Sequence, residues 1–359
     1  MKFVAFSGLP FHRWCLEDVV KSARSRGHEV VDVGHRPTHA HDWWTGSAET
    51  CSALADAAAN ADFVVVADYP YAQLRNGLRL GTKIVSVRHS LASRGNTYQL
   101  EQADADVLPL FSEYDRDRLD SAKLLPKIGS LRSAPGTGCP WAGPMFVEKL
   151  SGDRMRLLDR LGIDRTDERP IVAVATTWNE WTSLDVVRAL AADGSRIVVW
   201  RPHWAASWRR PGEADLVRSF GAYVDDPLAH PAGLLLAADI LVGDVSGIVL
   251  LATLVRSGKG ARFGRIVEGA LPIVQIDPDL AALSSSGQLD IGGPEWTFRK
   301  ATGPRVSAAR AAERIADAVD SLLVDDPWRA SRATVGQTLA GTYTDGTSAD
   351  RLVQRLESS

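Results

Sequence analysis

An apolar run, a small polar turn and a second apolar run follow one another between residues 237 and 255. The first run ends at Asp244, and Ser246 and Gly247 form the turn. If the second run opens a helix, the turn presents free backbone N–H groups and a hydroxyl, with no side chain at Gly247 to block approach, which suits a phosphate. The same pattern fits a buried strand followed by an N-capped helix, and Asp244 fits a cap as well as it fits a residue that orients the turn or a histidine.

Polar residues also follow other apolar runs of the chain. Short apolar runs separated by helical patterns predict parallel strands joined by crossovers, and ligands of such sheets bind outside the carboxyl ends of the strands. The occurrence of several polar residues at strand ends is therefore stronger evidence for a ligand site than any one of these residues. The residues found there are His89, Thr176, Thr177, His203, Asp225, Asp226, Asp244 and Ser246.

The elements that must position these residues form two alternations of strands and helices. In the first, the patterns predict strands at residues 2–6, 29–33, 63–67, 83–87 and 107–111, and helices at 12–26 and 48–59. In the second, they predict strands at 171–175, 196–200, 222–224, 240–242 and 273–276. Helices are expected there at 154–161, 183–192, 232–238, 307–323 and 349–356.

The two alternations predict an α/β protein of two facing, doubly wound, Rossmann-like parallel-sheet domains. A length of 359 residues agrees with two domains. The Pro- and Gly-rich stretch from Ser130 to Gly143 is interpreted as a loop or linker. The expected domains are residues 1–145 and 146–330, and residues 331–359 are expected to form a helical tail that crosses back to the first domain.

Composition argues against several classes of function. With 45% hydrophobic and 24% charged residues the chain resembles an ordinary globular protein, and a net charge of -3 without a block of Lys or Arg argues against nucleic acid as a partner. Three scattered cysteines offer no metal-type pair and no disulfide framework, which is typical of the cytoplasm. The first residues are interrupted too early for a signal peptide. The apolar passage 232–255 contains two aspartates and would be a poor membrane span.

An ordered set of short motifs resembles the CDP-glycerol glycerophosphotransferases, the teichoic-acid polymerase-like enzymes of GT-B architecture. Residues 88–90 (Arg-His-Ser) are similar to a His-Gly-Thr turn of that family, and residues 174–178 (Val-Ala-Thr-Thr-Trp) resemble its Ala-Pro-Thr-Trp strand end. Residues 201–203 are similar to its Arg-Pro-His. Residues 236–246 resemble its Leu-x-x-Ala-Asp-x-Leu-Ile-x-Asp-Tyr-Ser segment, and residues 343–352 resemble its Asp-Gly-x-Ala-Ser-x-Arg ending.

The sequence departs from the family pattern after His89 and after Ser246. Ser90 replaces the glycine after the first histidine, and residues 91–94 lack the family's Pro-Leu-Lys-Lys continuation. Gly247 replaces the second serine, and residues 258–271 form a longer, more basic link than the family has. These departures bear on the identity of the donor and the acceptor more than on the fold.

The resemblance implies that His89 is a general base. A neutral imidazole can take a proton from an acceptor hydroxyl, which would then attack the distal phosphorus of a CDP-linked alcohol while CMP leaves. The alternative for His89 is a histidine that hydrogen bonds within its own loop.

The resemblance also implies a donor-binding set in the second half of the chain. Arg201 and His203 are expected to bind the pyrophosphate, and His203 to stabilise charge on the leaving group. Ser246 is expected to hold a phosphate, and Thr176 and Thr177 to donate hydroxyls to it. The alternatives are a surface ion pair for Arg201 and strand-end packing for the two threonines.

This interpretation requires neither a metal nor a cofactor besides the CDP-linked substrate. His35, His39 and His41 share one polar loop, where solvation is expected rather than metal binding. Trp204 and Trp208 would share one face of a helix. Packing is expected for this pair, with base stacking and contact with anionic lipid as alternatives.

The predicted function is therefore transfer of a glycerol-phosphate or related polyol-phosphate group from a CDP-activated donor to a hydroxyl acceptor, which is a polyol, a glycan or a lipid-linked molecule. Residues 1–145 would serve the acceptor and residues 146–330 the nucleotide donor. A bacterial, cytoplasmic enzyme is expected, with peripheral contact at the inner membrane face as an alternative. The first alternative is a GT-B nucleotide-sugar glycosyltransferase or epimerase. The second is a non-catalytic nucleotide-binding relative, which the altered residues after His89 suggest.

Overall fold

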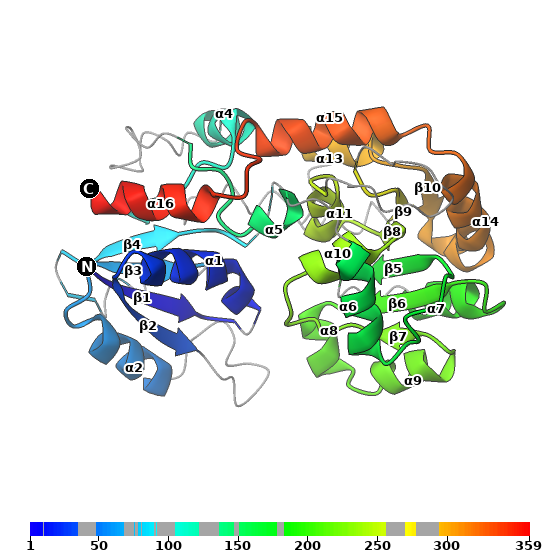
Figure 1. Cartoon of the computed structure of the whole chain (residues 1–359), viewed down its shortest axis with the longest axis horizontal. Helices are drawn as coiled ribbons and strands as arrows, with labels where there is room; N and C mark the ends of the chain where they lie inside the picture. Colours follow the sequence, from blue (N-terminus) through cyan, green and yellow to red (C-terminus); the bar gives the residue numbers. More distant parts are fainter. Residues whose placement is uncertain are drawn as a thin grey trace. The chain divides into compact units, whose positions relative to one another are not determined.

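The computed structural model shows two compact α/β units, each built on its own parallel sheet (Figure 1). Residues 1–90, 96–144 and 338–359 form the first unit, and residues 91–95 and 145–337 form the second. The structure describes residues 1–9, 11–34, 48–67, 75, 78–79, 81–89, 91, 105–121, 136–146, 151–177, 183–255, 270–277 and 294–359.

The sheet of the first unit has four parallel strands in the order β2-β1-β3-β4. These strands are β1 (Lys2–Ser7), β2 (Glu29–Gly34), β3 (Phe63–Val66) and β4 (Lys83–Ser86). They are short apolar runs, as expected for strands buried on both faces. The predicted strand at 107–111 is wrong in extent, because only Val107 forms a bridge, to Val85, before a loop leads into α4 (Glu113–Ser121).

Helices cover both faces of this sheet. Alternate residues of β1 point to opposite faces, so Val4 and Phe6 pack with Leu54 of α2 (Ala48–Ala58), whereas Phe3 and Ala5 lie on the side of α1 (His12–Ser25). The carboxyl ends of the strands lead into the turns that carry the polar residues. The amphipathic pattern of α1 is what anchors the first of these turns to the core.

The C-terminal segment packs on the first unit. Helix α16 (Ser348–Glu357) lies beside α1 and buries Leu352 and Val353. Polar contacts surround this apolar seam: the Ser22 hydroxyl donates to Asp350 at 2.5 Å, and Arg26 pairs with Glu357. The segment that resembles the family ending is thus part of the first unit's packing.

Residues 136–143, the described part of the Pro- and Gly-rich stretch, also belong to this unit. The backbone N–H groups of Thr137 and Gly138 both donate to the Leu110 carbonyl, and Arg351 of α16 donates to the Thr137 carbonyl at 3.0 Å. Helix α5 (Gly143–Phe146) follows, and Pro144 is the last residue of the first unit at this point.

The sheet of the second unit has six parallel strands in the order β10-β9-β8-β5-β6-β7. They are β5 (Ile171–Ala175), β6 (Ile197–Arg201), β7 (Tyr223–Val224), β8 (Ile240–Gly243), β9 (Ile273–Asp277) and β10 (Arg305–Ser307). The chain runs outward from β5 to β7, then returns to the other side of β5 and continues from β8 to β10. The order therefore reverses between β5 and β8, which is the point where open α/β sheets bind ligands.

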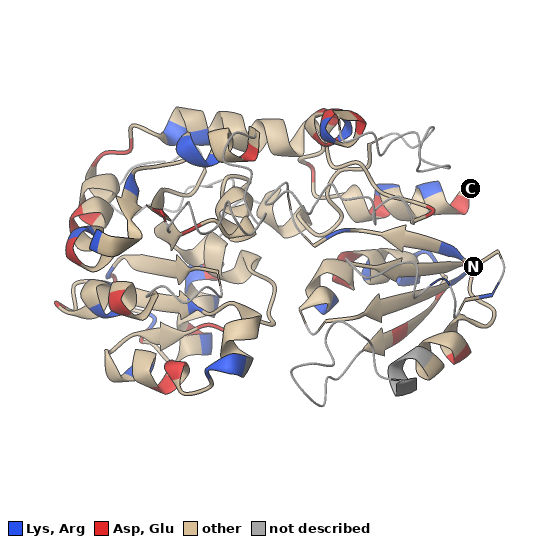
Figure 2. Cartoon of the chain, turned by 180° about the vertical axis from the view of Figure 1, so that it is seen from behind, with Lys and Arg blue, Asp and Glu red and all other residues tan. Residues whose placement is uncertain are grey.

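Two layers of helices enclose this second sheet. One face packs on α7 (Ser183–Ala191), α9 (Glu213–Ser219) and α14 (Ala311–Val324), which share a core with Val172, Val174 and Val242. The remaining helices are α6 (Ser151–Leu161), α8 (Trp204–Arg209), α10 (Ala232–Ala237), α11 (Gly247–Ala252), α13 (Pro294–Lys300), the 3-10 turn η4 (Ala308–Arg310) and α15 (Arg329–Ala340). Figure 2 shows acidic and basic residues interspersed along the helices of each unit.

Candidate functional site

The carboxyl ends of β5 and β8 are joined by one buried carboxylate. Asp244 accepts hydrogen bonds from the Thr177 N–H at 2.9 Å and the Thr177 hydroxyl at 2.5 Å, both at Oδ2. Its Oδ1 accepts from the Ser246 N–H at 2.8 Å. Asp244 therefore fixes both turns at the reversal of strand order. Because the Thr177 N–H and hydroxyl proton are used here, Thr177 in this arrangement positions the turn rather than donating to a ligand.

In the turn after β8, Ser246 is half-buried, whereas Asp244 is fully buried. Ser246 is the N-cap of α11, and its Oγ accepts from the Ile248 N–H at 3.4 Å, so its own hydroxyl proton can point outward. Gly243 allows α11 to approach the strand: a Cβ built there would lie 2.5 Å from Cγ2 of Val249. The N-capped helix that the sequence offered as an alternative is present, and an anion site at this turn stays a prediction.

A buried arginine supports this turn from α13. Arg299 is 1% exposed, and its Nη1 donates to the carbonyls of Asp244 at 3.0 Å and Ser246 at 3.2 Å. The Gln275 amide donates to the Arg299 carbonyl and, at 2.8 Å, to the Thr302 hydroxyl. Arg299 is not predicted from the sequence, because it is 53 residues from Ser246 and follows no strand. Only the tertiary fold brings it under the turn.

Burial dominates the electrostatics of Asp244. Loss of water raises the pKa of this carboxyl, while the hydrogen bonds from Thr177 and Ser246 and the charge of Arg299 act in the opposite direction. The three donors show that Asp244 holds the turns as an acceptor. It is 1% exposed, so it has no face left for a ligand.

Arg201, expected to bind a pyrophosphate, is committed to the loop after β7. Its guanidinium pairs with Asp225 at 2.5 Å and donates to the carbonyls of Asp226, Pro227 and Ala229. Burial lowers the pKa of Arg201, opposed by the charge of Asp225. This ion pair is buried rather than on the surface. Direct contact between Arg201 and a ligand therefore stays a prediction. In the structure, Arg201 holds the loop after β7 in place.

His203 caps α8 through its ring. Nδ1 accepts from the Ala205 N–H at 3.2 Å, so the neutral ring carries its proton on Nε2. His203 is half-buried, and in this tautomer it offers an N–H donor from Nε2. His230 is arranged in the same way, with Nδ1 accepting from the Ala232 N–H at 3.0 Å. Thr176, at the neighbouring strand end, is 6% exposed.

In the first unit, His89 follows β4 on a strained turn. Arg88 before it has φ of 45°, in the left-handed region that non-glycine residues seldom adopt. The Arg88 guanidinium, 1% exposed, makes a double hydrogen bond to Asp115 at 2.8 and 2.6 Å, and the Trp141 indole donates to the Arg88 carbonyl at 2.6 Å. The guanidinium also lies over the Phe111 ring at 4.1 Å. These contacts hold the turn from both sides.

His89 itself is half-buried among rings from the start of α1. The Phe11 ring meets it edge-on with centroids 5.2 Å apart, and the His12 ring stacks with it at 5.9 Å. The sequence predicts His12 only as the first residue of a helix. The role of His89 as a general base and its alternative, a hydrogen bond within its own loop, both stay predictions.

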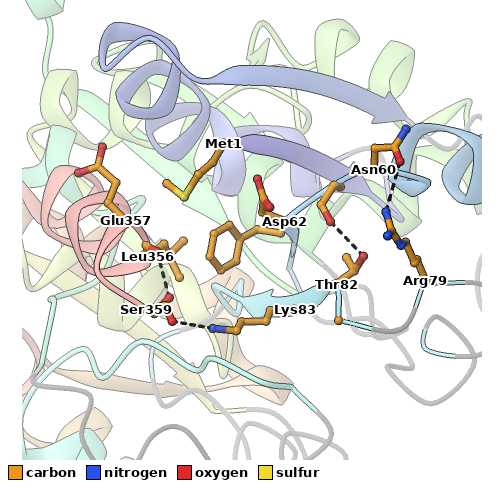
Figure 3. Close-up of a pocket in the computed structure, with 12 residues that line it drawn as sticks. Met1, Asn60, Asp62, Arg79, Thr82, Lys83, Leu356, Glu357 and Ser359 are labelled. Atoms are coloured by element: carbon orange, nitrogen blue, oxygen red, sulfur yellow. Dashed lines mark hydrogen bonds between the residues drawn. The ribbon is translucent and has the colours of Figure 1, made fainter.

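The cavity in Figure 3 lies at the other end of the same sheet. It has a volume of about 410 Å³ and is bordered by the starts of β3 and β4 and the end of α16. Across it the Asn60 side chain accepts from Arg79 at 3.4 Å, and the Thr82 hydroxyl donates to the Ala61 carbonyl at 3.0 Å. Ligands of parallel sheets bind at carboxyl ends, so this amino-end hollow is not the predicted site.

Several predictions lie outside the described residues. These are the His35, His39 and His41 loop, Ser90, Trp178, residues 256–269 and the side chain of Trp208. Trp204 is half-buried beside His203, with ring centroids 5.4 Å apart. Within the described ranges, no cluster of three or more His, Cys, Asp or Glu has the geometry of a metal site, and no helix is long and apolar enough to cross a membrane.

Comparison with known proteins supports the fold and leaves the sequence family open. No family model matches the chain, and no curated protein matches it. Among solved structures, a variant of the wall teichoic acid polymerase TagF soaked with CDPG covers 99% of this chain and 88% of its own, at 12% identity and a TM-score of 0.65. TagF itself matches over the same shares at 12% identity and 0.62.

A second kind of protein shares the architecture. The Anabaena protein Alr3699/HepE, in complex with UDP and glucose, covers 100% of both chains at 13% identity and a TM-score of 0.51. At these identities the likeness concerns the fold. The chain has the GT-B-like fold of two parallel-sheet α/β units that its sequence predicts.

Proposed function

We propose that the protein transfers a glycerol-phosphate or related polyol-phosphate group from a CDP-activated donor to a hydroxyl acceptor. The observation that carries the proposal is the Asp244 network at the reversal of strand order, which holds Ser246 beside the end of β5. The fold likeness to TagF, whose variant was soaked with CDPG, favours a CDP-linked donor over other nucleotides. The same likeness favours an enzyme of the transferase kind.

The chemistry divides between groups of the two units. His89 accepts the proton of the acceptor hydroxyl, whose oxygen attacks the phosphorus that bears the polyol. A new P–O bond forms, the bond between that phosphorus and the bridging oxygen breaks, and CMP leaves with the electron pair. Transfer of this kind depends on positioning and on stabilising negative charge.

Donor binding is assigned to neutral and backbone donors of the second unit. His203 donates to the donor phosphates through Nε2–H, the tautomer that the hydrogen bond from the Ala205 N–H to Nδ1 favours. Ser246 offers its hydroxyl, and the N–H groups at Gly247 adjoin it. Thr176 adds a second hydroxyl, while Arg201 and Asp244 hold the turns in place.

A thermal-shift titration tests the donor. The purified protein is titrated with CMP, CDP, CDP-glycerol, UDP, GDP and UDP-glucose, because a ligand of the folded state raises the midpoint in proportion to its binding. We expect selective stabilisation by the cytidine nucleotides. Stabilisation by UDP or UDP-glucose alone would overturn the proposal in favour of sugar transfer.

A variant pair ties the binding to the site. Ser246→Ala removes the hydroxyl at the turn and is expected to weaken CDP-glycerol binding several-fold, at about the cost of one hydrogen bond to a charged group. Ser219→Ala is the matched control, because Ser219 is exposed and bonds only the Leu216 carbonyl of its own helix. Equal affinity in both variants would remove Ser246 from the donor site.

The product decides the reaction. Incubation with CDP-glycerol and candidate polyol or glycan acceptors, followed by phosphorus NMR, is expected to show CMP and a new phosphodiester. Binding of CDP-glycerol without turnover on any acceptor would favour the non-catalytic rival, and a glycosidic product from a UDP-sugar would favour the glycosyltransferase rival.

A further inference from the structure

A buried histidine that the proposed reaction does not use lies against the proposed base. His12, the first residue of α1, is fully buried at 0% exposure. Its ring stacks with that of His89 at 5.9 Å between centroids and 27° between planes, the offset arrangement that aromatic rings favour. An apolar side chain would fill such a place without burying ring nitrogens, so a histidine here calls for an explanation.

A third ring completes the contact. Phe11 meets His12 edge-on at 4.6 Å and 75°, and meets His89 edge-on at 5.2 Å and 81°. The three rings therefore pack as a cluster in which each touches the other two. His89, the half-buried member, is bounded by two rings that both come from the start of α1.

The start of α1 is itself firmly anchored. The His12 N–H donates to the Leu9 carbonyl at 2.9 Å, which closes the turn between β1 and α1. Leu16 and Val19 of the same helix are 2% exposed and lie against the sheet. The surface that His12 presents to His89 is thus fixed relative to the strand that carries His89.

We propose that His12 is a positioning residue: with Phe11, it holds the His89 imidazole in the one orientation that proton transfer needs. His12 is too deeply buried to touch a substrate, so it acts through His89. Because His89 is the base of the proposed transfer, the inference rests on that function. A base must lie within hydrogen-bond reach of the proton, and a displacement of about 1 Å can cost about a hundredfold in rate.

Relaxation NMR tests the positioning without reference to any reaction. The Cε1–H group of His89, assigned by its loss in His89→Gln, is expected to be as ordered as the backbone in the unaltered protein and in His12→Phe. In His12→Ala, where one wall of the cluster is gone, the same group is expected to become mobile. An equally ordered His89 ring in His12→Ala would overturn the proposal.

Kinetics tests the consequence for catalysis. His12→Ala is expected to lower kcat about tenfold to a hundredfold with KM for the donor within twofold, and His12→Phe, which keeps a ring, is expected to restore most of kcat. A folded His12→Phe as inactive as His12→Ala would overturn the role of ring packing. If His12→Ala fails to fold, Phe11→Leu takes its place, with the same expected order of effects on His89 mobility and kcat.

His28 provides the matched control. Its ring also packs on a phenylalanine, Phe3, at 5.3 Å, and it bonds Glu357, but it precedes β2 at the amino end of the sheet. His28→Ala is expected to lower Tm while leaving kcat and the mobility of His89 unchanged. If the unaltered protein turns over no CDP-linked donor, the proposed function fails while the NMR comparison still decides the positioning.

Discussion

The two strand-end turns that carry the candidate chemistry are built with opposite charges. In the first unit, the turn after β4 is held by a buried cation, Arg88, which pairs with Asp115. In the second unit, the turn after β8 is held by a buried anion, Asp244, which accepts from Thr177 and Ser246. In each unit the charged residue of the motif is about 1% exposed.

The less buried residue is in both turns a neutral or weakly basic neighbour. His89 follows Arg88, and Ser246 lies two residues after Asp244; both are half-buried. Arg201 repeats the arrangement, since it is buried against Asp225 and is followed two residues later by the half-buried His203. The charged members of these motifs organise the backbone, and the side chain that the proposed function uses is the less buried neighbour of each.

Removing the imidazole of His89 in the first turn is expected to have the largest effect on activity. His89→Ala should lower kcat by about 10² to 10⁴, the usual contribution of a general base, and should also lower Tm, because the ring packs against Phe11 and His12. Initial rates with CDP-glycerol and an accepted hydroxyl compound provide the measurement, and the thermal shift with CDP-glycerol should persist. Full activity in His89→Ala would remove the assignment and break the parallel between the turns.

Removing one partner of the buried Arg88–Asp115 ion pair is expected to act mainly by lowering the free energy of unfolding. Arg88→Met leaves Asp115 buried without its cation and should cost about 3–5 kcal/mol of unfolding free energy, measured by urea denaturation. Asp115→Asn should behave similarly. The double variant Arg88→Met/Asp115→Leu should be less destabilised than the sum of its single changes. Additive losses would mean that the pair is not what holds the turn.

Much of the fold follows from the sequence because apolar strands repeat the same signal. The strand predicted at 171–175 is β5 as observed, and the strand at 240–242 extends by one residue in β8. Most of helix α15 lies within the predicted helical tail 331–359, but the sequence predicted no bounds for it, because it lacks a strong apolar stripe. Strand β10 is not predicted: it has three residues, and the last of them, Ser307, is included in the predicted helix 307–323.

The candidate site could be predicted only as far as neighbours in sequence reach. Thr177, Asp244 and Ser246 were found because each follows an apolar run, a feature that one segment displays by itself. His12 and Arg299 could not be found in this way, since each meets its turn through the tertiary packing of a helix. The same limit applies to Arg201: its contacts with the loop after β7 are not visible in the sequence, and its contact with a ligand stays a prediction.

The close packing under the second turn gives a smaller and sharper test. Gly243→Ala would place a Cβ 2.5 Å from Val249 Cγ2 and should cost about 1–3 kcal/mol, because α11 must move away from the strand. Gly212→Ala is the control, because a Cβ at Gly212 meets no atom within 4 Å and should change stability by no more than about 0.5 kcal/mol. If α11 supports the turn, Gly243→Ala also weakens CDP-glycerol binding, whereas equal behaviour of the two variants would separate the helix from the site.

The smallest expected effect concerns acid, and it distinguishes the units. The hydrogen bond from Arg26 lowers the pKa of Glu357 from 4.5 to about 2 in the folded protein, with His28 acting in the same direction. Because the folded pKa lies below the unfolded one, this contribution to stability is complete above pH 4.5 and is lost as the pH falls toward 2. Hydrogen exchange should therefore show α16 opening first in acid, and Glu357→Gln should remove part of that pH dependence.

Buried Asp244 has its pKa raised by burial, so its protonation on acidification does not oppose folding. Exchange that rises earlier at α11 than at α16 would reverse the expected order.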